Sequence, residues 1–395
     1  MNPPSLWYLF TTFLKIGSAS FGGFMALIAV VQDQLVERDK IIKNEIVLDG
    51  ISLTSILPGP VAVNTVAYIG YHLRGMKGAL ISILGVIIPS FILICILSHF
   101  YFEYGQNDYI TAIFKGVLPA VCGIILSVAY KMGKKNITDY RQVILALFSA
   151  VILFSFGGFL TTFIIIAIGG SAGYFMYNKR PSSNKQKPTP IKVKAIIYII
   201  ILVVICLSLG PIALFLSGFK TGIIPDSFSL IGAFSSISIG LFGGGYVFLP
   251  VMQEVIVNHY EWVTLNEFAD GVALGQITPG PIMITATFVG YKVQGVWGAF
   301  LATVGMFLPP GLLTIYCSKF IQPLKSSSAI QSAFKGVRAV VIGMILAATI
   351  VIGKDLDFVW QTLVIGSSVL GVCIFSKVPV IFVIFSSGIL GLILF

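Results

Sequence analysis

Long apolar runs, separated by short polar segments, occupy almost the whole chain. Most of these runs approach the roughly 20 residues that an α-helix needs to cross a bilayer. The pattern therefore predicts an all-α polytopic membrane protein with about 13 spans. The predicted spans cover residues 5–31, 45–72, 76–100, 109–131, 142–156, 159–178, 195–217, 227–251, 266–292, 296–318, 329–353, 358–374 and 378–395.

One polar segment interrupts this pattern for longer than a tight loop would. The run from Asn178 to Pro188 is rich in Lys, Ser and Pro, a composition typical of a linker. The predicted domains are an N-terminal repeat (1–180), a polar basic linker (181–194), an extra connecting helix (195–222) and a C-terminal repeat (223–395).

The two repeats are related by an internal duplication. Glycine, proline and aspartate positions coincide at a spacing of 221 residues, which becomes 220 after the loss of one residue. The coincident pairs include Phe21-Gly22-Gly23 with Phe242-Gly243-Gly244, Asp49 with Asp270, Pro58-Gly59-Pro60 with Pro279-Gly280-Pro281, Gly75 with Gly295, Pro89 with Pro309 and Lys115 with Lys335. Chance similarity between apolar helices does not align such residues in register, so we predict two homologous halves.

The repeated Pro-Gly-Pro motif predicts a broken helix in each half. Proline lacks the backbone donor and fixes φ, while glycine removes the steric bias toward the right-handed helix. Within a bilayer, irregular backbone is tolerated only where protein buries it or where it lines a polar cavity. Two breaks in equivalent positions therefore predict a site between the halves.

The relative orientation of the halves depends on these breaks. If each broken segment crosses the membrane once, the spans of the first half and the extra helix together make an odd number of crossings. The second half then begins on the opposite side, and the halves are inverted repeats. If each segment turns back as a re-entrant hairpin, the halves are parallel. We predict the inverted arrangement, although it places Arg38, Lys40 and Lys43 outside, against the rule that basic loops are cytoplasmic.

The half-helix that restarts after each break can hold an anion. It offers unpaired N–H groups and a partial positive charge of about +0.5, so no basic side chain is required. The predicted substrate-binding residues are Pro58, Gly59, Pro60, Asn64, Thr65, Pro279, Gly280, Pro281, Thr285 and Thr287, with Gly22, Gly23, Gly243 and Gly244 as further candidates. The simpler interpretations are a plain kink at each Pro-Gly-Pro and close helix packing at the other glycines.

Charged residues at or within apolar spans are the remaining candidates. Those for anion attraction are Lys115, Lys335 and Arg338, and those for proton coupling are Asp49, Asp270 and Glu254. A buried charge in a membrane is costly and therefore tends to be functional. The alternatives are that the lysines snorkel to the interface and that the acids only cap or begin their helices.

Composition narrows the function classes. Hydrophobic residues make up 57% of the chain and charged residues 10%, whereas soluble domains carry about 25% charge. The net charge of +10 lies in short loops, where it sets orientation, so the expected partner is membrane lipid and not nucleic acid. Five dispersed cysteines and three isolated histidines form no metal-ligand pattern. Since no P-loop is present, transport would be secondary, and no cofactor is expected.

Two longer runs carry a family resemblance. They are FGGGYVFLP at 242–250 and ALGQITPGPIMITATFVGY at 273–291. The first half agrees through Phe21-Gly22-Gly23, Val36-Glu37-Arg38, Leu57-Pro58-Gly59-Pro60 and Tyr68-Ile69-Gly70-Tyr71. The chain resembles the chromate ion transporter family over essentially its whole length, in the two-half form of that family.

The resemblance implies a multi-pass plasma-membrane protein with oppositely oriented halves. It also implies export of chromate driven by the proton motive force, with sulfate as the look-alike anion. The chain departs from the family pattern at Phe24, where first halves usually have Pro, and in the stretch 26–29, which lacks the usual His.

We therefore expect a secondary transporter that exports chromate or a sulfate-like divalent oxyanion. An anion channel, or an exchanger for a different small anion, is the alternative. An enzyme acting on a lipid phosphate is disfavoured, because the sequence has no nucleophile or metal-ligand cluster for such a reaction. The oligomeric state is left open, with a homodimer as one option.

Overall fold

The computed structural model describes residues 4–21, 24–104, 107–156, 159–177, 227–241, 248–318, 328–354, 356, 359–376 and 378–395. Every regular element within these ranges is a helix, as the hydropathy pattern predicted. Four of the described helices are long and apolar enough to cross a membrane, namely Val61–Tyr104, Asp108–Asn136, Ile282–Cys317 and Gln331–Gly353. The predicted linker (181–194) and connecting helix (195–222) lie outside the described residues.

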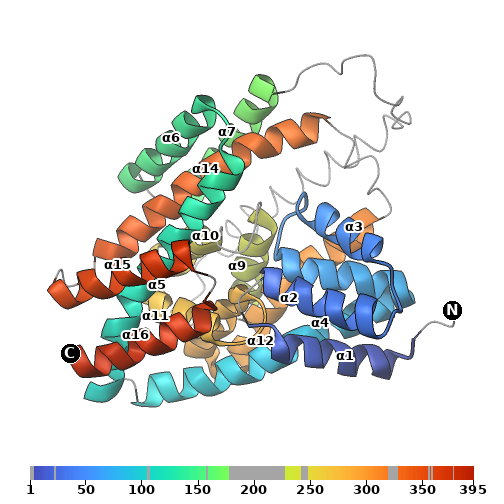
Figure 1. Ribbon diagram of the computed structural model, residues 1–395, viewed down its shortest axis with the longest axis horizontal. Helices are drawn as coiled ribbons and strands as arrows, with labels where there is room; N and C mark the ends of the chain where they lie inside the picture. Colours follow the sequence, from blue (N-terminus) through green and yellow to red (C-terminus); the bar gives the residue numbers. More distant parts are fainter. Residues whose placement is uncertain are drawn as a thin grey trace.

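The two halves contain equivalent helices in the same order. The first half has α1 (Leu6–Ala19), α2 (Phe24–Val31), η1 (Gln32–Arg38), α3 (Asn44–Thr54), α4 (Val61–Tyr104), α5 (Asp108–Asn136), α6 (Tyr140–Phe156) and α7 (Phe159–Tyr177). The second half has α9 (Ser227–Gly240), α10 (Phe248–Gln253), η3 (Glu254–His259), α11 (Leu265–Ile277), η4 (Ile282–Ile284), α12 (Thr285–Cys317), α14 (Ser328–Lys354), α15 (Trp360–Phe375) and α16 (Val380–Leu394). Figure 1 shows α1 to α3 at one end of the molecule and α15 and α16 at the other.

Unusual backbone conformations occur in pairs at the repeat spacing. Positive φ angles are found at Gly59 and Gly280 (100° and 101°), at Gly75 and Gly295 (60° and 58°), and at Lys40 and Glu261 (51° and 53°). The π-helical segments η1 and η3 also occupy equivalent positions. Because π-helical segments, and positive φ angles at residues other than glycine, are rare and cost free energy, their pairing confirms the duplication at the level of local structure.

The first broken segment folds back on itself at Pro-Gly-Pro. The Oγ1 atoms of Thr54 in α3 and Thr65 in α4 share a hydrogen bond of 2.9 Å. Gly50, one turn before Thr54, packs against Tyr68, almost one turn after Thr65. Contacts that run backwards along one helix and forwards along the next define an antiparallel hairpin.

The second broken segment has the same geometry. Gly275 packs against Thr285, and Gly271, one turn earlier, packs against Phe288. The sequence left two alternatives open for residues 45–72 and 266–292, a single crossing or a hairpin, and the hairpin describes both. The reversal follows from the positive φ angles at the central glycines of the two motifs, which an uninterrupted helix cannot contain.

The first predicted span of each half is divided as well. Residues 5–31 form two helices, α1 and α2, where one continuous span was predicted. The hydroxyl of Tyr8, near the start of α1, donates a hydrogen bond to Asp39, just after η1. The two ends of this segment are therefore neighbours, which makes it another hairpin. Residues 227–251 are divided between α9 and α10 in the same way.

A third reversal separates each Pro-Gly-Pro hairpin from the long helix that follows. α4 changes direction at Gly75, where the backbone is not helical. A Cβ added at Gly70 would approach the carbonyl oxygen of Gly78 to 2.6 Å, so the two sides of this turn lie back to back. The part of α4 before the turn thus returns alongside its long part (76–104). α12 turns in the same way at Gly295.

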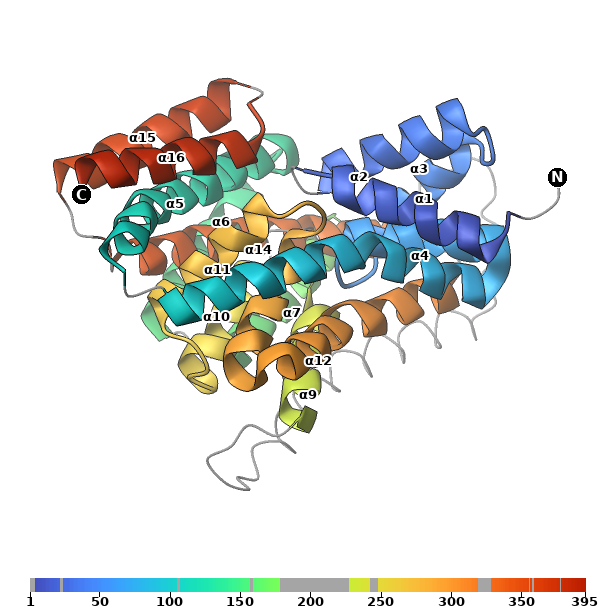
Figure 2. The same ribbon diagram turned by 90° about the horizontal axis from the view of Figure 1, so that it is seen from below.

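The two Pro-Gly-Pro hairpins approach α4 from opposite ends. The first hairpin is joined directly to the start of the long part of α4. The second reaches its other end, where Tyr291 Oη forms a hydrogen bond with His99 Nδ1 (3.1 Å) and Tyr101 Oη donates to Asp270 Oδ2 (2.6 Å). Figure 2 shows α3 near one end of α4 and α11 near the other. The tips of the two hairpins therefore point toward each other.

The last two helices of each half pack against the other half. α6 and α7 pack against α14, and α15 and α16 pack against α5 (Figure 1). Glycines permit the close approach, because Gly116 in α5 faces Gly391 in α16 and Gly336 in α14 faces Gly169 and Gly173 in α7. Each half thus completes the packing of the other.

We expect Gly336→Leu to destabilise the folded protein, because its Cβ would overlap the backbone of Gly169 and Gly173. Overpacking costs about 1–3 kcal/mol, and a backbone neighbour cannot move aside as a side chain can. The temperature at which the detergent-solubilised protein loses its monodisperse chromatographic peak should fall by several degrees. Gly353→Leu on the same helix is the matched control, since nothing lies within 4 Å of its Cβ. Equal losses in both variants would contradict the exchanged packing.

Candidate functional site

Each Pro-Gly-Pro tip is bonded to the first hairpin of the opposite half. The Gly59 N–H donates to the carbonyl oxygen of Leu241 (2.7 Å), and the Gly280 N–H donates to the carbonyl oxygen of Ser20 (2.7 Å). Ser20 and Leu241 are repeat equivalents, immediately after α1 and α9. The prolines and glycines of both motifs are buried. The two tips are therefore held inside the protein by a reciprocal pair of backbone hydrogen bonds.

The tips lie near the middle of the long helices. A Cβ added at Gly280 would overlap Ser90 Oγ, and a Cβ added at Gly59 would overlap the ring of Pro310. Ser90 stands halfway along the long part of α4 (76–104), and Pro310 is its repeat equivalent in α12. Glycine is required at both tips, because of these contacts and because of the positive φ angles.

Backbone N–H groups at the start of each half-helix lie outside the helical ladder. After the first tip, the first helical hydrogen bond runs from the Asn64 N–H to the Pro60 carbonyl oxygen (2.9 Å), so the N–H groups of 61–63 precede it. After the second tip, the corresponding bond runs from Ile284 to Pro281 (3.0 Å). These N–H groups and the positive end of each helix dipole can bind an anion. The glycine N–H groups, by contrast, are already used between the halves.

The carbonyl group of the first proline in each motif accepts a hydrogen bond from a different source. Asn64 Nδ2 donates to the carbonyl oxygen of Pro58 (3.0 Å) from within the same half. Ser90 Oγ donates to the carbonyl oxygen of Pro279 from the opposite half. The two motifs are thus equivalent in backbone shape but are supported by different side chains.

Asn64 also carries a buried oxygen without a partner. Its side chain is fully buried, and no hydrogen-bond donor among the described residues reaches its Oδ1. Leaving such an acceptor unpaired costs about 1–3 kcal/mol. Because Asn64 lies in the first turn after the tip, this oxygen is suited to a water molecule or a protonated group held between the halves.

The threonine hydroxyls predicted to bind substrate support the hairpins instead of pointing freely into a site. Thr65 Oγ1 donates to the Val61 carbonyl oxygen (2.7 Å) and Thr285 Oγ1 to the Ile282 carbonyl oxygen (3.0 Å). Thr287 Oγ1 shares a hydrogen bond with Thr303 Oγ1 (2.7 Å). A direct contact between these hydroxyls and a substrate stays a prediction.

The glycines predicted beside the breaks, Gly22, Gly23, Gly243 and Gly244, lie outside the described residues. Their neighbours Ser20 and Leu241 are the residues that contact the tips, and the sequence reasoning did not select them. Ser90 was missed too. The available signal was its position directly after Pro89, one of the prolines that coincide between the repeats.

The two candidate lysines lie on the protein surface. Lys115 Nζ stands over the ring of Phe395 (5.9 Å from the centroid), and Lys335 Nζ stands over the ring of Tyr177 (5.3 Å). Both side chains are exposed, whereas Arg338 is partly buried. The lysines therefore fit the snorkelling alternative, and their role in attracting an anion stays a prediction.

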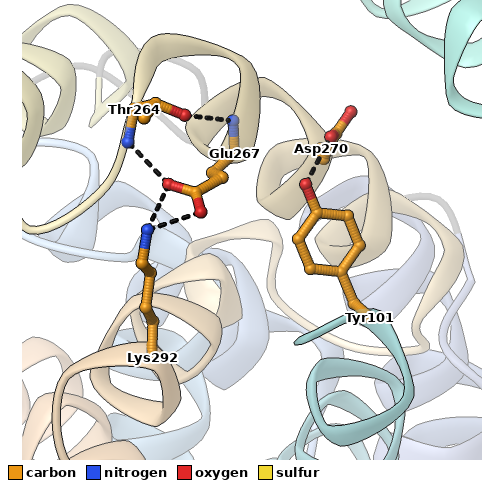
Figure 3. Close-up of polar contacts among 5 residues, drawn as sticks. All are labelled: Tyr101, Thr264, Glu267, Asp270 and Lys292. Carbon is orange, nitrogen blue, oxygen red and sulfur yellow. Dashed lines mark hydrogen bonds and ion pairs between the residues drawn. The ribbon is translucent and has the colours of Figure 1, made fainter. Parts of the chain in front are cut away.

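The two acids of the second Pro-Gly-Pro hairpin, Glu267 and Asp270, contact polar side chains of neighbouring helices, Lys292 on α12 and Tyr101 on α4 (Figure 3). Asp270 is 8% exposed and accepts the hydrogen bond from Tyr101. Glu267 caps α11 together with Thr264 and forms an ion pair with Lys292. Partial burial alone would raise the pKa of Glu267, but the hydrogen bonds from Lys292 and from Thr264 outweigh it and hold that pKa below its usual range.

The other candidate acids are Glu254 and Asp49. Glu254 begins η3 and accepts a hydrogen bond from Asn258 Nδ2 (2.8 Å), in keeping with a role in the local helix. Asp49, the repeat equivalent of Asp270, is only half-buried. Within the part of the chain that the structure describes, no group of three or more His, Cys, Asp or Glu residues could hold a metal ion.

Comparisons with known proteins identify the family. The sequence model of the chromate transporter family matches residues 7–174 and 228–392, one segment in each half. An uncharacterized transporter of Methanocaldococcus jannaschii is 30% identical, with 92% of this chain and 88% of the relative covered. A probable chromate transport protein of Synechococcus elongatus is also 30% identical, with the same coverage. A chromate transport protein of Cupriavidus metallidurans is 28% identical, over 87% of this chain and 81% of the relative.

No solved structure matches the chain. The family match spans both halves and the motifs at both tips, and it places the protein among membrane transporters and not among enzymes. The chain belongs to the chromate transporter family.

Proposed function

We propose that the protein is a secondary active transporter that exports chromate, or a sulfate-like divalent oxyanion, from the cytoplasm across the plasma membrane. Transport is coupled to the proton motive force. The oxyanion binds between the halves, at the two Pro-Gly-Pro tips. Chromate is the leading substrate because relatives with high coverage carry it in their names.

One observation carries this proposal. Two half-helix N-termini approach each other from opposite ends of α4. Each tip is hydrogen-bonded to the first hairpin of the opposite half, through the N–H groups of Gly59 and Gly280. Helix N-termini stabilise anions through N–H groups and the helix dipole. A tetrahedral oxyanion can accept hydrogen bonds from both termini at once, since it carries acceptor oxygens on all sides. The contacts of the tips with Ser90 and Pro310, midway along the long helices, support a site near the bilayer midplane, where transporters built from repeats bind their substrates.

The proposed topology is inverted. Each hairpin begins and ends on one side, so the crossing segments of the first half are the long part of α4, α5, α6 and α7. The predicted helix at 195–217 adds one crossing, and the second half then begins on the opposite side. The parallel arrangement expected for hairpins assumed that residues 5–31 cross once, which α1 and α2 do not.

This topology also resolves the charge conflict noted in the sequence. Arg38, Lys40 and Lys43 join the two hairpins of the first half and fall on the same side as Lys134 and Lys135 at the end of α5. All five are then cytoplasmic, as the rule for basic loops requires.

Labelling of single cysteines tests the topology. In a cysteine-free background, Lys43→Cys should be protected from a membrane-impermeant thiol reagent in whole cells and should react after permeabilisation. Asp108→Cys, at the start of α5, is the matched control, because it is extracellular whether the first broken segment crosses or folds back. Labelling of Lys43→Cys in intact cells would contradict the inverted hairpin topology.

Flux in proteoliposomes tests the function. The reconstituted full-length protein should accumulate chromate against its concentration gradient when a pH gradient is imposed, and excess sulfate should compete. Protein-free liposomes are the control. An anion channel, the alternative, would equilibrate chromate with the membrane potential and would not respond to the pH gradient at zero potential. Absence of chromate and sulfate flux would overturn the proposed substrate class.

The site itself is tested by the tip glycines. Gly59→Ala and Gly280→Ala should reduce chromate flux at least tenfold, because the added methyl group overlaps Pro310 or Ser90 at the point where the halves meet. Gly295→Ala is the matched control. It shares the positive φ, a backbone strain that costs alanine about 1–3 kcal/mol, but has nothing within 4 Å of its Cβ. Normal flux in both tip variants, at equal amounts of inserted protein, would rule out a site at the tips.

A further inference from the structure

Asp270 is buried at a contact between the halves. It stands on α11 in the second half, nine residues before Pro279, and is 8% exposed. Its hydrogen-bond donor is Tyr101, which belongs to the first half and lies near the end of α4 (Figure 3). Any rearrangement that moves α11 along α4 changes the surroundings of this carboxyl group.

No cation neutralises Asp270 among the described residues. Lys292, on the neighbouring α12, is bound to Glu267 instead. The ionisable groups on the other helices packed against α11 include His99 and Glu103 on α4, Asp108 and Lys115 on α5, and Lys335 and Arg338 on α14. Of these, His99 contacts Tyr291, and the two lysines stand over aromatic rings. A carboxylate without a cation is costly to bury. Binding of a proton would remove the charge of Asp270 and would therefore lower the free-energy cost of excluding water from it.

The first half lacks this arrangement. At the repeat spacing, Ile46 replaces Glu267, His72 replaces Lys292 and Ile321 replaces Tyr101. Asp49 itself is half-buried, whereas Asp270 is buried. The paired acids are therefore equivalent in sequence position but differ in burial, and among the described residues Asp270 is the more enclosed of the two.

We propose that Asp270 alone carries the coupling proton, and that Tyr101 is the positioning residue that links its loading to the contact between the halves. This inference rests on the proposed function. In the inverted topology, Asp270 lies toward the outer face. Its carboxylate accepts a proton from the outer water, the halves rearrange, and the same proton is released to the cytoplasmic water. No covalent bond of the oxyanion changes.

The test separates coupling from anion movement. In proteoliposomes with the full-length protein, chromate flux and chromate-dependent proton flux are measured together, the latter with an internal pH-sensitive dye. The proton flux of Asp270→Asn should be at least tenfold lower than that of the unmodified protein, and the variant should no longer accumulate chromate under a pH gradient. Exchange of chromate for chromate at equal pH should persist, which a merely misfolded variant would not support.

Two variants of the first hairpin complete the test. Glu45→Gln, an exposed acid in the first turn of α3, is the control for reconstitution and should keep both fluxes. Asp49→Asn should keep proton coupling. Coupling that survives in Asp270→Asn, or that is lost equally in Asp49→Asn, overturns the proposal. Chromate transport by the unmodified protein without proton flux overturns it too, while leaving the anion site intact. Absence of any chromate flux overturns the proposed function itself.

Tyr101→Phe provides a second measurement, in case Asp270→Asn is not recovered as folded protein. The Tyr101 hydroxyl donates to the carboxylate and stabilises its charged form. Its removal should therefore shift the half-maximal pH of chromate transport upward, with little change in the rate of chromate–chromate exchange. An unchanged pH profile would show that Tyr101 has no part in coupling and would overturn that assignment.

Discussion

A helix that breaks inside a bilayer must find partners for its exposed backbone, and this constraint organises the whole protein. At the tips, two hydrogen bonds supply these partners: the Gly59 N–H donates to the Leu241 carbonyl oxygen, and the Gly280 N–H donates to the Ser20 carbonyl oxygen. Both join one half to the other, so neither glycine N–H finds its acceptor within its own repeat. The fixed approach of the two half-helix termini follows from this mutual dependence. An oxyanion site at that point needs no basic residue, because the backbone supplies the donors.

The outer helices extend the same dependence between the halves. α6 and α7 lie on α14, and α15 and α16 lie on α5. Lipid provides no hydrophobic driving force for such contacts, so close packing through glycine pairs such as Gly116 and Gly391 holds them. The exchange makes the two repeats one structural unit.

The sequence predicted the helical class, the duplication, both breaks and the family. It did not predict that the chain folds back, because Pro-Gly-Pro is compatible with a kink and with a reversal, and the difference lies in the φ angle of Gly59. The division of residues 5–31 was missed for a similar reason, since glycines within an apolar run also suit close packing. The Thr65 hydroxyl was assigned to substrate, whereas its orientation toward Val61 depends on a rotamer that composition does not encode.

The two tips are copies that no longer have the same support. Asn64 holds Pro58 from within its own half, whereas Ser90 holds Pro279 from across the interface. If the halves separate there, the second tip loses its side-chain hydrogen bond and the first keeps it. The inward-facing and outward-facing states of an inverted repeat are interchangeable only when its halves are identical. In the proposed inverted topology that symmetry is broken at the centre of the molecule by the side chains of Asn64 and Ser90. The two proposed states would then differ in energy, which would give the transporter a built-in resting direction.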